Sequence, residues 1–69
     1  MKGGANMNEY RFIAKVSNMD DVSGETFRFI ERTIRDDVEQ VAWVRFALWV
    51  FRNIEENETV DQIKVIDTI

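Results

Sequence analysis

The chain has 69 residues, which is enough for one domain with a small core. It contains no cysteine and no histidine, so composition excludes disulfide bonds, the usual zinc sites and a histidine general base. A net charge of −4 works against general attraction to nucleic acid, whereas 45% hydrophobic residues predict a packed core.

Residues 1–8 are small and polar and include two glycines, so the sequence predicts a flexible tail before a single domain at residues 9–69. Codons for residues 2–4 can spell a purine-rich ribosome-binding sequence, with a suitable spacer before Met7. One hypothesis is that translation starts at Met7 in a bacterium or bacteriophage, and an ordinary flexible N-terminus is the alternative.

No apolar run in the sequence is long enough to cross a membrane, and the N-terminus has no apolar segment typical of a secretory signal. We therefore expect a cytoplasmic protein with no membrane partner.

Residues 9–17 alternate between two sets of side chains, and this period of two predicts a strand. The expected core face of that strand carries Tyr10, Phe12, Ala14 and Val16. Residues 18–24 are rich in Asn, Asp, Ser and Gly, which predicts a chain reversal. Residues 25–34 are predicted to form the second strand of a hairpin, with Phe27 and Phe29 on its core face.

A helix is predicted from Asp37 to about Asn53 or Glu55, because no Gly or Pro interrupts this segment. Asp36 and Glu39 have the spacing of a capping box, in which the aspartate accepts a backbone amide hydrogen bond at the helix start.

Residues 58–69 are predicted to form a third strand, with Ile63, Val65 and Ile69 on one side. The element order is ββαβ, which predicts an α+β fold with a three-stranded, mainly antiparallel sheet packed on one long helix. A right-handed crossover can place the last strand antiparallel beside the first or parallel beside the second. The first arrangement is favoured because it keeps the aromatic-rich first strand central.

The predicted helix carries more apolar surface than one small sheet can cover. One arc is expected to face the sheet, and it holds Val38, Val41, Val44, Ala47, Leu48 and Phe51. A second arc is expected to stay outside and bind a protein, in the simplest case a second copy of the chain. The predicted partner-binding residues are Trp43, Phe46, Trp49, Val50 and Ile54. The alternatives are a sheet that curls around the helix, or a covering formed by the tail and residues 18–24.

The sheet face opposite the helix is expected to be basic, with isoleucines between the charges. The residues that could meet an anionic partner are Arg11, Lys15, Arg28, Arg32 and Lys64. Because this assignment leaves no aromatic ring there for base stacking, it weakens a nucleic-acid-binding function. An ordinary solvated sheet face is the alternative.

Residues typical of catalysis are lacking, since the glycines form no phosphate loop, the paired carboxylates lack calcium-loop spacing, and no histidine can activate a serine. The sequence therefore predicts no enzyme, metal or cofactor. The favoured function is a homodimeric protein-binding regulator or inhibitor of bacterial or phage origin, for example an anti-CRISPR-like inhibitor of a host defence nuclease. The alternatives are a nucleic-acid-binding module that uses the basic sheet face, and a purely structural subunit.

Overall fold

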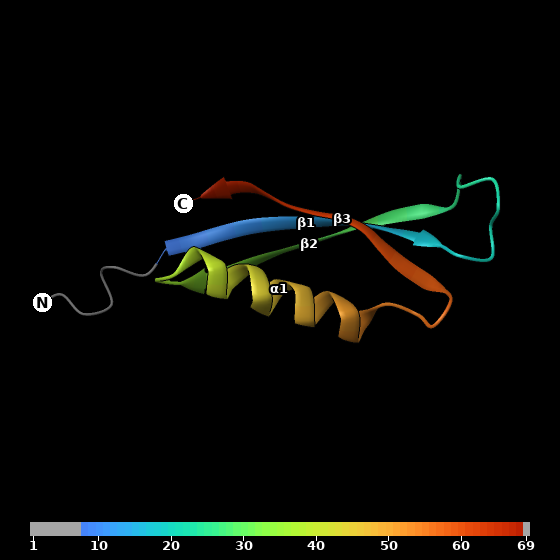
Figure 1. Cartoon of the computed structure of the whole chain (residues 1–69). Helices are drawn as coiled ribbons and strands as arrows, with labels where there is room; N and C mark the ends of the chain where they lie inside the picture. Colours follow the sequence, from blue (N-terminus) through green and yellow to red (C-terminus); the bar gives the residue numbers. More distant parts are fainter. Residues whose placement is uncertain (1–7, 69) are drawn as a thin grey trace, which may run out of the picture.

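A computed structural model describes residues 8–68 as two layers, a three-stranded sheet and one helix that lies on one face of it (Figure 1). The strands are β1 (Asn8–Asn18), β2 (Phe27–Asp36) and β3 (Glu58–Thr68), and helix α1 spans Glu39–Asn53. The sheet order is β2-β1-β3, and both outer strands pair antiparallel with β1. The predicted ββαβ order and the predicted place of the last strand beside the first are confirmed.

Three sequence-based expectations fall wholly or mostly outside the described residues. They are the tail at residues 1–8, of which only Asn8 is described, the translation start at Met7, and the position of Ile69. Asn8 itself begins β1.

The helix begins two residues later than predicted, at Glu39, because the aspartate does not cap it. Asp36 instead accepts a hydrogen bond from the backbone amide of Val38 at 3.0 Å, and this contact lowers its pKa. Glu39 does not reach back to the chain entering the helix, because its side chain accepts a hydrogen bond from Trp43 Nε1.

The core lies between β1 and α1. Tyr10, Phe12, Ala14 and Val16 of β1 are at most 4% exposed, as predicted from their alternation. The Phe12 ring stacks on Phe46 of α1 with 5.1 Å between ring centroids. Because β1 is the central strand, its apolar face receives most of the cover that a single helix provides.

β2 has the opposite face assignment to the one expected. Tyr10 pairs with Ile34 and Ala14 pairs with Ile30 across the hairpin, and directly paired residues point to the same side of a sheet. Phe27 and Phe29 therefore lie on the face away from the helix, where they are 47% and 59% exposed. Their predicted core position is wrong. Alternate residues of a strand point to opposite faces, so an error of one residue in the inward-facing positions moves every side chain to the other face of the sheet.

The turn between β1 and β2 is organised by one carboxylate. Asp21 accepts hydrogen bonds from the Ser23 amide, the Ser23 hydroxyl and the Thr26 amide. These bonds, that of the Ser23 hydroxyl first, lower the pKa of Asp21 to about 2. Gly24 has a φ of 73°, a conformation that other residues adopt only with strain. The hairpin projects beyond the C-terminal end of α1 (Figure 1).

A second carboxylate joins the start of β3 to β2 and to the end of the helix. Glu58 accepts hydrogen bonds from Arg28 at 2.9 and 2.8 Å and from the Glu55 backbone amide at 2.8 Å. Its side chain is only 12% exposed. The Arg28 contact, followed by the Glu55 amide, lowers the pKa of Glu58 to about 2.

Acid should weaken the fold in a defined pH window because of these two carboxylates. The pKa of Glu58 falls from its ordinary 4.5 to about 2, so its contribution is complete above pH 4.5 and is lost as pH falls through about 2. The pKa of Asp21 falls from 3.8 to about 2, so its contribution to stability is complete above pH 3.8 and is lost as pH falls through about 2. Glu58→Gln should therefore lower the melting temperature at pH 7 and reduce its decline between pH 5 and pH 2.

The matched control for this prediction is Glu56→Gln, since Glu56 makes no side-chain hydrogen bond or ion pair within residues 8–68. Thermal unfolding followed by circular dichroism at several pH values checks both variants. A Glu58→Gln profile parallel to that of the natural sequence would contradict the proposed role of this carboxylate.

Candidate functional site

Four apolar side chains form a row along the side of α1 that faces away from the sheet. They are Val41, Val44, Leu48 and Phe51, and we name this row the helix ridge. Their exposed fractions are 44%, 58%, 52% and 61%. Steps of three, four and three residues keep them on one side of an α-helix. The ridge is therefore a continuous apolar strip.

The side of the helix that was predicted to bind a partner instead covers the sheet. Phe46 and Val50 have no exposed surface, and Trp43, Trp49 and Ile54 are partly buried against the core. The outward orientation predicted for these five residues is wrong. The arc expected to face the sheet supplies the helix ridge.

Aromatic area and one small residue account for the orientation of the helix. The sheet side carries three aromatic rings, at Trp43, Phe46 and Trp49, whereas the ridge carries one, at Phe51. Each aromatic ring buries roughly 150–250 Å², so turning this side inward hides more apolar surface. Ala42 is fully buried on the same side, and its small side chain allows α1 to approach the sheet closely.

Both tryptophans also find polar or charged neighbours at the edge of the core. Trp43 Nε1 donates a hydrogen bond to Glu39 at 3.2 Å. The Arg32 guanidinium lies over the Trp49 ring, 4.7 Å from its centroid. These contacts add to the preference for the observed helix orientation, because a partly buried indole needs a partner for its N–H and attracts a cation to its face.

The sheet leaves one apolar side of the helix exposed, and this is the opposite side to the one expected, since Trp43, Phe46 and Val50 pack into the core. The four ridge side chains together present several hundred Å² of apolar surface, about the largest patch usual on a soluble monomer. Sequence reasoning named two apolar arcs correctly and assigned them to the wrong sides.

The open face of the sheet, which is the face away from α1, carries three of the five predicted basic residues. The pairing of β1 with its neighbours places Arg11, Lys15 and Lys64 there. Arg28 and Arg32 are on the helix side, because they pair with the buried residues Val16 and Phe12. Their predicted place on the open face is wrong for the same reason as the predicted place of the two phenylalanines. The even-numbered residues of β2 face the helix, and the odd-numbered ones face away from it.

The open face therefore has aromatic rings, contrary to expectation. Phe27 and Phe29 meet edge to face, with 5.7 Å between centroids and 81° between ring planes. Lys15 lies beside them, and its ammonium is 4.7 Å from the centroid of the Phe27 ring. Arg11 is placed 3.8 Å from Glu31 across the hairpin, a weak exposed ion pair.

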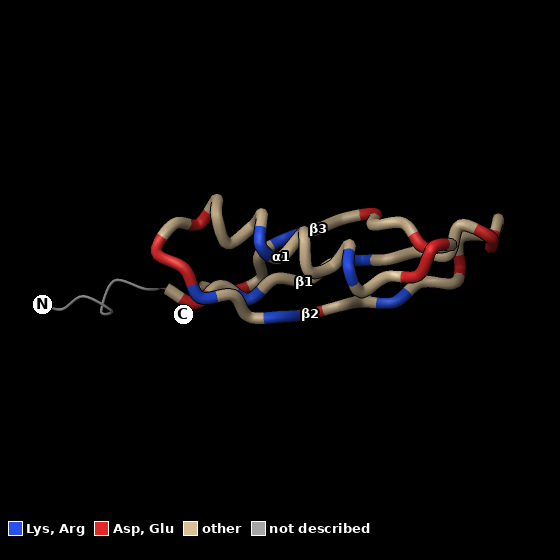
Figure 2. Tube along the Cα trace, turned by 90° about the horizontal axis from the view of Figure 1, so that it is seen from below, with Lys and Arg blue, Asp and Glu red and all other residues tan. Residues whose placement is uncertain are grey.

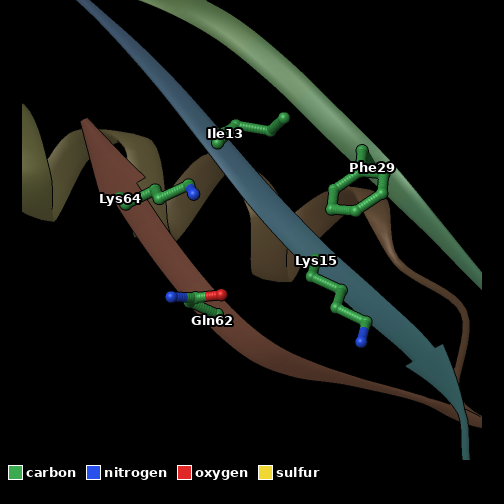
Figure 3. A pocket seen from close by; sticks show the side chains of 5 residues that line it. All are labelled: Ile13, Lys15, Phe29, Gln62 and Lys64. Carbon is green, nitrogen blue, oxygen red and sulfur yellow. The ribbon is translucent and has the colours of Figure 1, made fainter. Parts of the chain in front are cut away.

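A hollow of about 280 Å³ lies in the middle of the open face. Its lining comes from all three strands and consists of Ile13 and Lys15 of β1, Phe29 of β2, and Gln62 and Lys64 of β3. Figure 3 shows these five side chains arranged around the centre of the face. We name it the sheet hollow. The alternation of β1 predicts Ile13 and Lys15 there, but Phe29 could not be found without the register of β2.

Comparison with protein-family models, with curated proteins and with solved structures finds no match for this chain. Within residues 8–68 no helix is both long enough and apolar enough to span a membrane. The same described residues contain no group of three or more acidic side chains arranged to hold a metal ion.

Proposed function

We propose that this protein works without catalysis, by binding protein through the helix ridge, and that the ridge pairs with the same ridge of a second copy. The observation that carries the proposal is the exposure of Val41, Val44, Leu48 and Phe51, which is 44% or more at each position although the residues form one apolar row. An apolar strip of this extent is typical of a surface that another chain covers.

The spacing of the ridge supports a helix as its partner. Val41 and Leu48 are seven residues apart, as are Val44 and Phe51, so the row has the alternating spacing of coiled-coil seam positions. Such side chains insert between those of a facing helix. A two-fold dimer brings one surface against an identical copy of itself. An apolar row suits this arrangement, because each row then covers the apolar side chains of the other.

The size of the ridge predicts a reversible dimer. A standard protein interface buries about 800 Å² on each partner, and the ridge offers several hundred. We therefore expect dissociation on the order of micromolar or weaker, with monomer and dimer in exchange. Pairing of identical ridges closes the assembly at two chains, because the surface is then occupied on both.

Sedimentation equilibrium of the natural sequence from about 10 µM to about 1 mM tests this proposal. The mean mass should rise from near 8.2 kDa towards twice that value, and no further. A mass that stays at 8.2 kDa over the whole range would contradict the dimer, and continued growth beyond two chains would contradict the closed pairing.

A further inference from the structure

We propose that the sheet hollow binds one nucleotide of a single-stranded nucleic acid, with the base against Phe29 and the phosphate between Lys15 and Lys64. This site is independent of the helix ridge, because the two surfaces lie on opposite sides of the sheet.

The lining of the hollow matches the parts of a nucleotide. Lys15 and Lys64 carry ammonium groups that suit a phosphate, and no carboxylate lines the hollow. The Phe29 ring is 59% exposed and offers a flat surface for a base. Gln62 can donate to and accept from a base edge, and Ile13 provides an apolar floor.

A second ring next to the first favours a strand over an isolated nucleotide. Phe27 lies two residues before Phe29 on the same edge strand and is 47% exposed. Phe27 therefore extends the aromatic surface beyond the hollow, and the Lys15 ammonium over its ring is placed to meet the phosphate that joins two successive nucleotides. An open sheet face with exposed rings and flanking cations is a common way to hold unpaired bases.

The charge distribution predicts a short contact. Figure 2 shows acidic positions mostly near the two ends of the molecule and basic positions mostly between them. On the open face Lys15 and Lys64 both line the central hollow, so a strand meets favourable charge near the middle of the sheet. With a net charge of −4 the chain gains nothing from distant electrostatics. Two phosphate-contacting lysines predict a slope of about −1.4 for log affinity against log salt concentration on a single strand.

Fluorescence anisotropy with labelled oligouridylate and oligothymidylate of about eight nucleotides, at low salt, tests the site. Saturable binding of at least one strand is expected, about tenfold tighter than uridine monophosphate and tighter than a duplex of the same length. Binding of the monophosphate as tight as that of the strand, a duplex bound more tightly, or no binding of either strand at low salt, would overturn the proposal.

Three variants assign the binding to the hollow. Lys15→Glu and Lys64→Glu should each weaken it several-fold, and each should reduce the salt slope by about 0.7. Phe29→Leu keeps an apolar side chain on the strand and should weaken binding by about tenfold with the slope unchanged. Circular dichroism spectra and thermal unfolding curves are the control that each variant is folded.

Arg52→Glu is the matched control, since it makes the same charge change as one lysine variant on the exposed last turn of α1. It should bind the strand about as well as the natural sequence. Equal weakening by Arg52→Glu and Lys64→Glu would show a net-charge effect and overturn the assignment to the hollow, as would full binding by Phe29→Leu.

Discussion

Phe46→Ala should remove most of the stability of the domain, by about 3–5 kcal/mol. Phe46 has no exposed surface and lies between the rings of Phe12 and Trp49, with centroids 5.1 and 5.9 Å away. At about 0.05–0.15 kcal/mol per residue, a chain of this length has roughly 3–10 kcal/mol of stability in total. Urea unfolding followed by circular dichroism should therefore show a variant that is unfolded or nearly so in buffer.

Phe51→Ala is the matched control, because it removes the same side chain from the same helix on its outer side. Phe51 is 61% exposed, so we expect a loss of about 1 kcal/mol or less. A larger loss in the free energy of unfolding for Phe46→Ala than for Phe51→Ala shows that the Phe46 side of α1 packs against the sheet. Equal losses, or a larger loss for Phe51→Ala, would mean that the helix has the opposite side against the sheet.

Leu48→Glu should abolish dimer formation over the accessible concentration range, a weakening of at least about 100-fold. In the proposed dimer Leu48 lies in the seam, where a carboxylate would lose its water without gaining a partner. In the monomer Leu48 is 52% exposed, so the fold should tolerate the change with a loss of about 1 kcal/mol or less. Sedimentation equilibrium should give the monomer mass at every concentration.

Thr33→Glu adds the same charge on the open face of the sheet, where Thr33 pairs with Arg11. It should leave the monomer–dimer equilibrium close to that of the natural sequence. If Leu48→Glu dimerised as the natural sequence does, the contact would lie elsewhere, for example along the outer edge of β2 or β3, and the proposed ridge pairing would be wrong.

The proposed dimer has a consequence for the sheet hollow. When the two ridges meet, the helices form the centre of the assembly and the sheets lie outside them. The two hollows then face away from each other, so one short strand cannot occupy both. Leu48→Glu should therefore leave the affinity for a short oligonucleotide unchanged.

The fold was predictable from the sequence where the local pattern of apolar residues fitted only one arrangement. The alternation of Tyr10, Phe12, Ala14 and Val16 defined the core face of β1, and all four are buried. A right-handed crossover through the helix left two places for the last strand, and keeping the aromatic-rich first strand central selected the observed one. These features depend on residues close together in sequence or on general rules of chain connection.

The helix orientation was not predictable from periodicity, because both sides of α1 are apolar at helical spacing. The choice depends on the fit to β1, where Phe12 meets Phe46 and Trp43, each with 5.1 Å between ring centroids. One signal was available in the sequence, since two tryptophans and a phenylalanine share one side. Weighing the two arcs by aromatic area would have favoured that side as the buried one.

The face of β2 was mispredicted because its apolar residues change parity along the strand. Phe27 and Phe29 are odd-numbered, whereas Ile30 and Ile34 are even-numbered. Alternation therefore predicts one core face from the phenylalanines and the opposite core face from the isoleucines. Pairing with β1 decides the matter by placing the isoleucines beside the core and the arginines Arg28 and Arg32 at its margin. Long arginine stems can cover apolar surface there while their charged ends contact Glu58 and Trp49.

The central claim is that one side of α1 holds the fold together while the other meets a second copy. Nuclear magnetic resonance of methyl-labelled protein at increasing concentration tests both parts in one measurement. We expect contacts from Val50 to the sheet, and concentration-dependent shifts at Val41, Val44 and Leu48 with Val50 unchanged. Contacts from Val44 and Leu48 to the sheet, with shifts concentrated at Val50, would contradict the account.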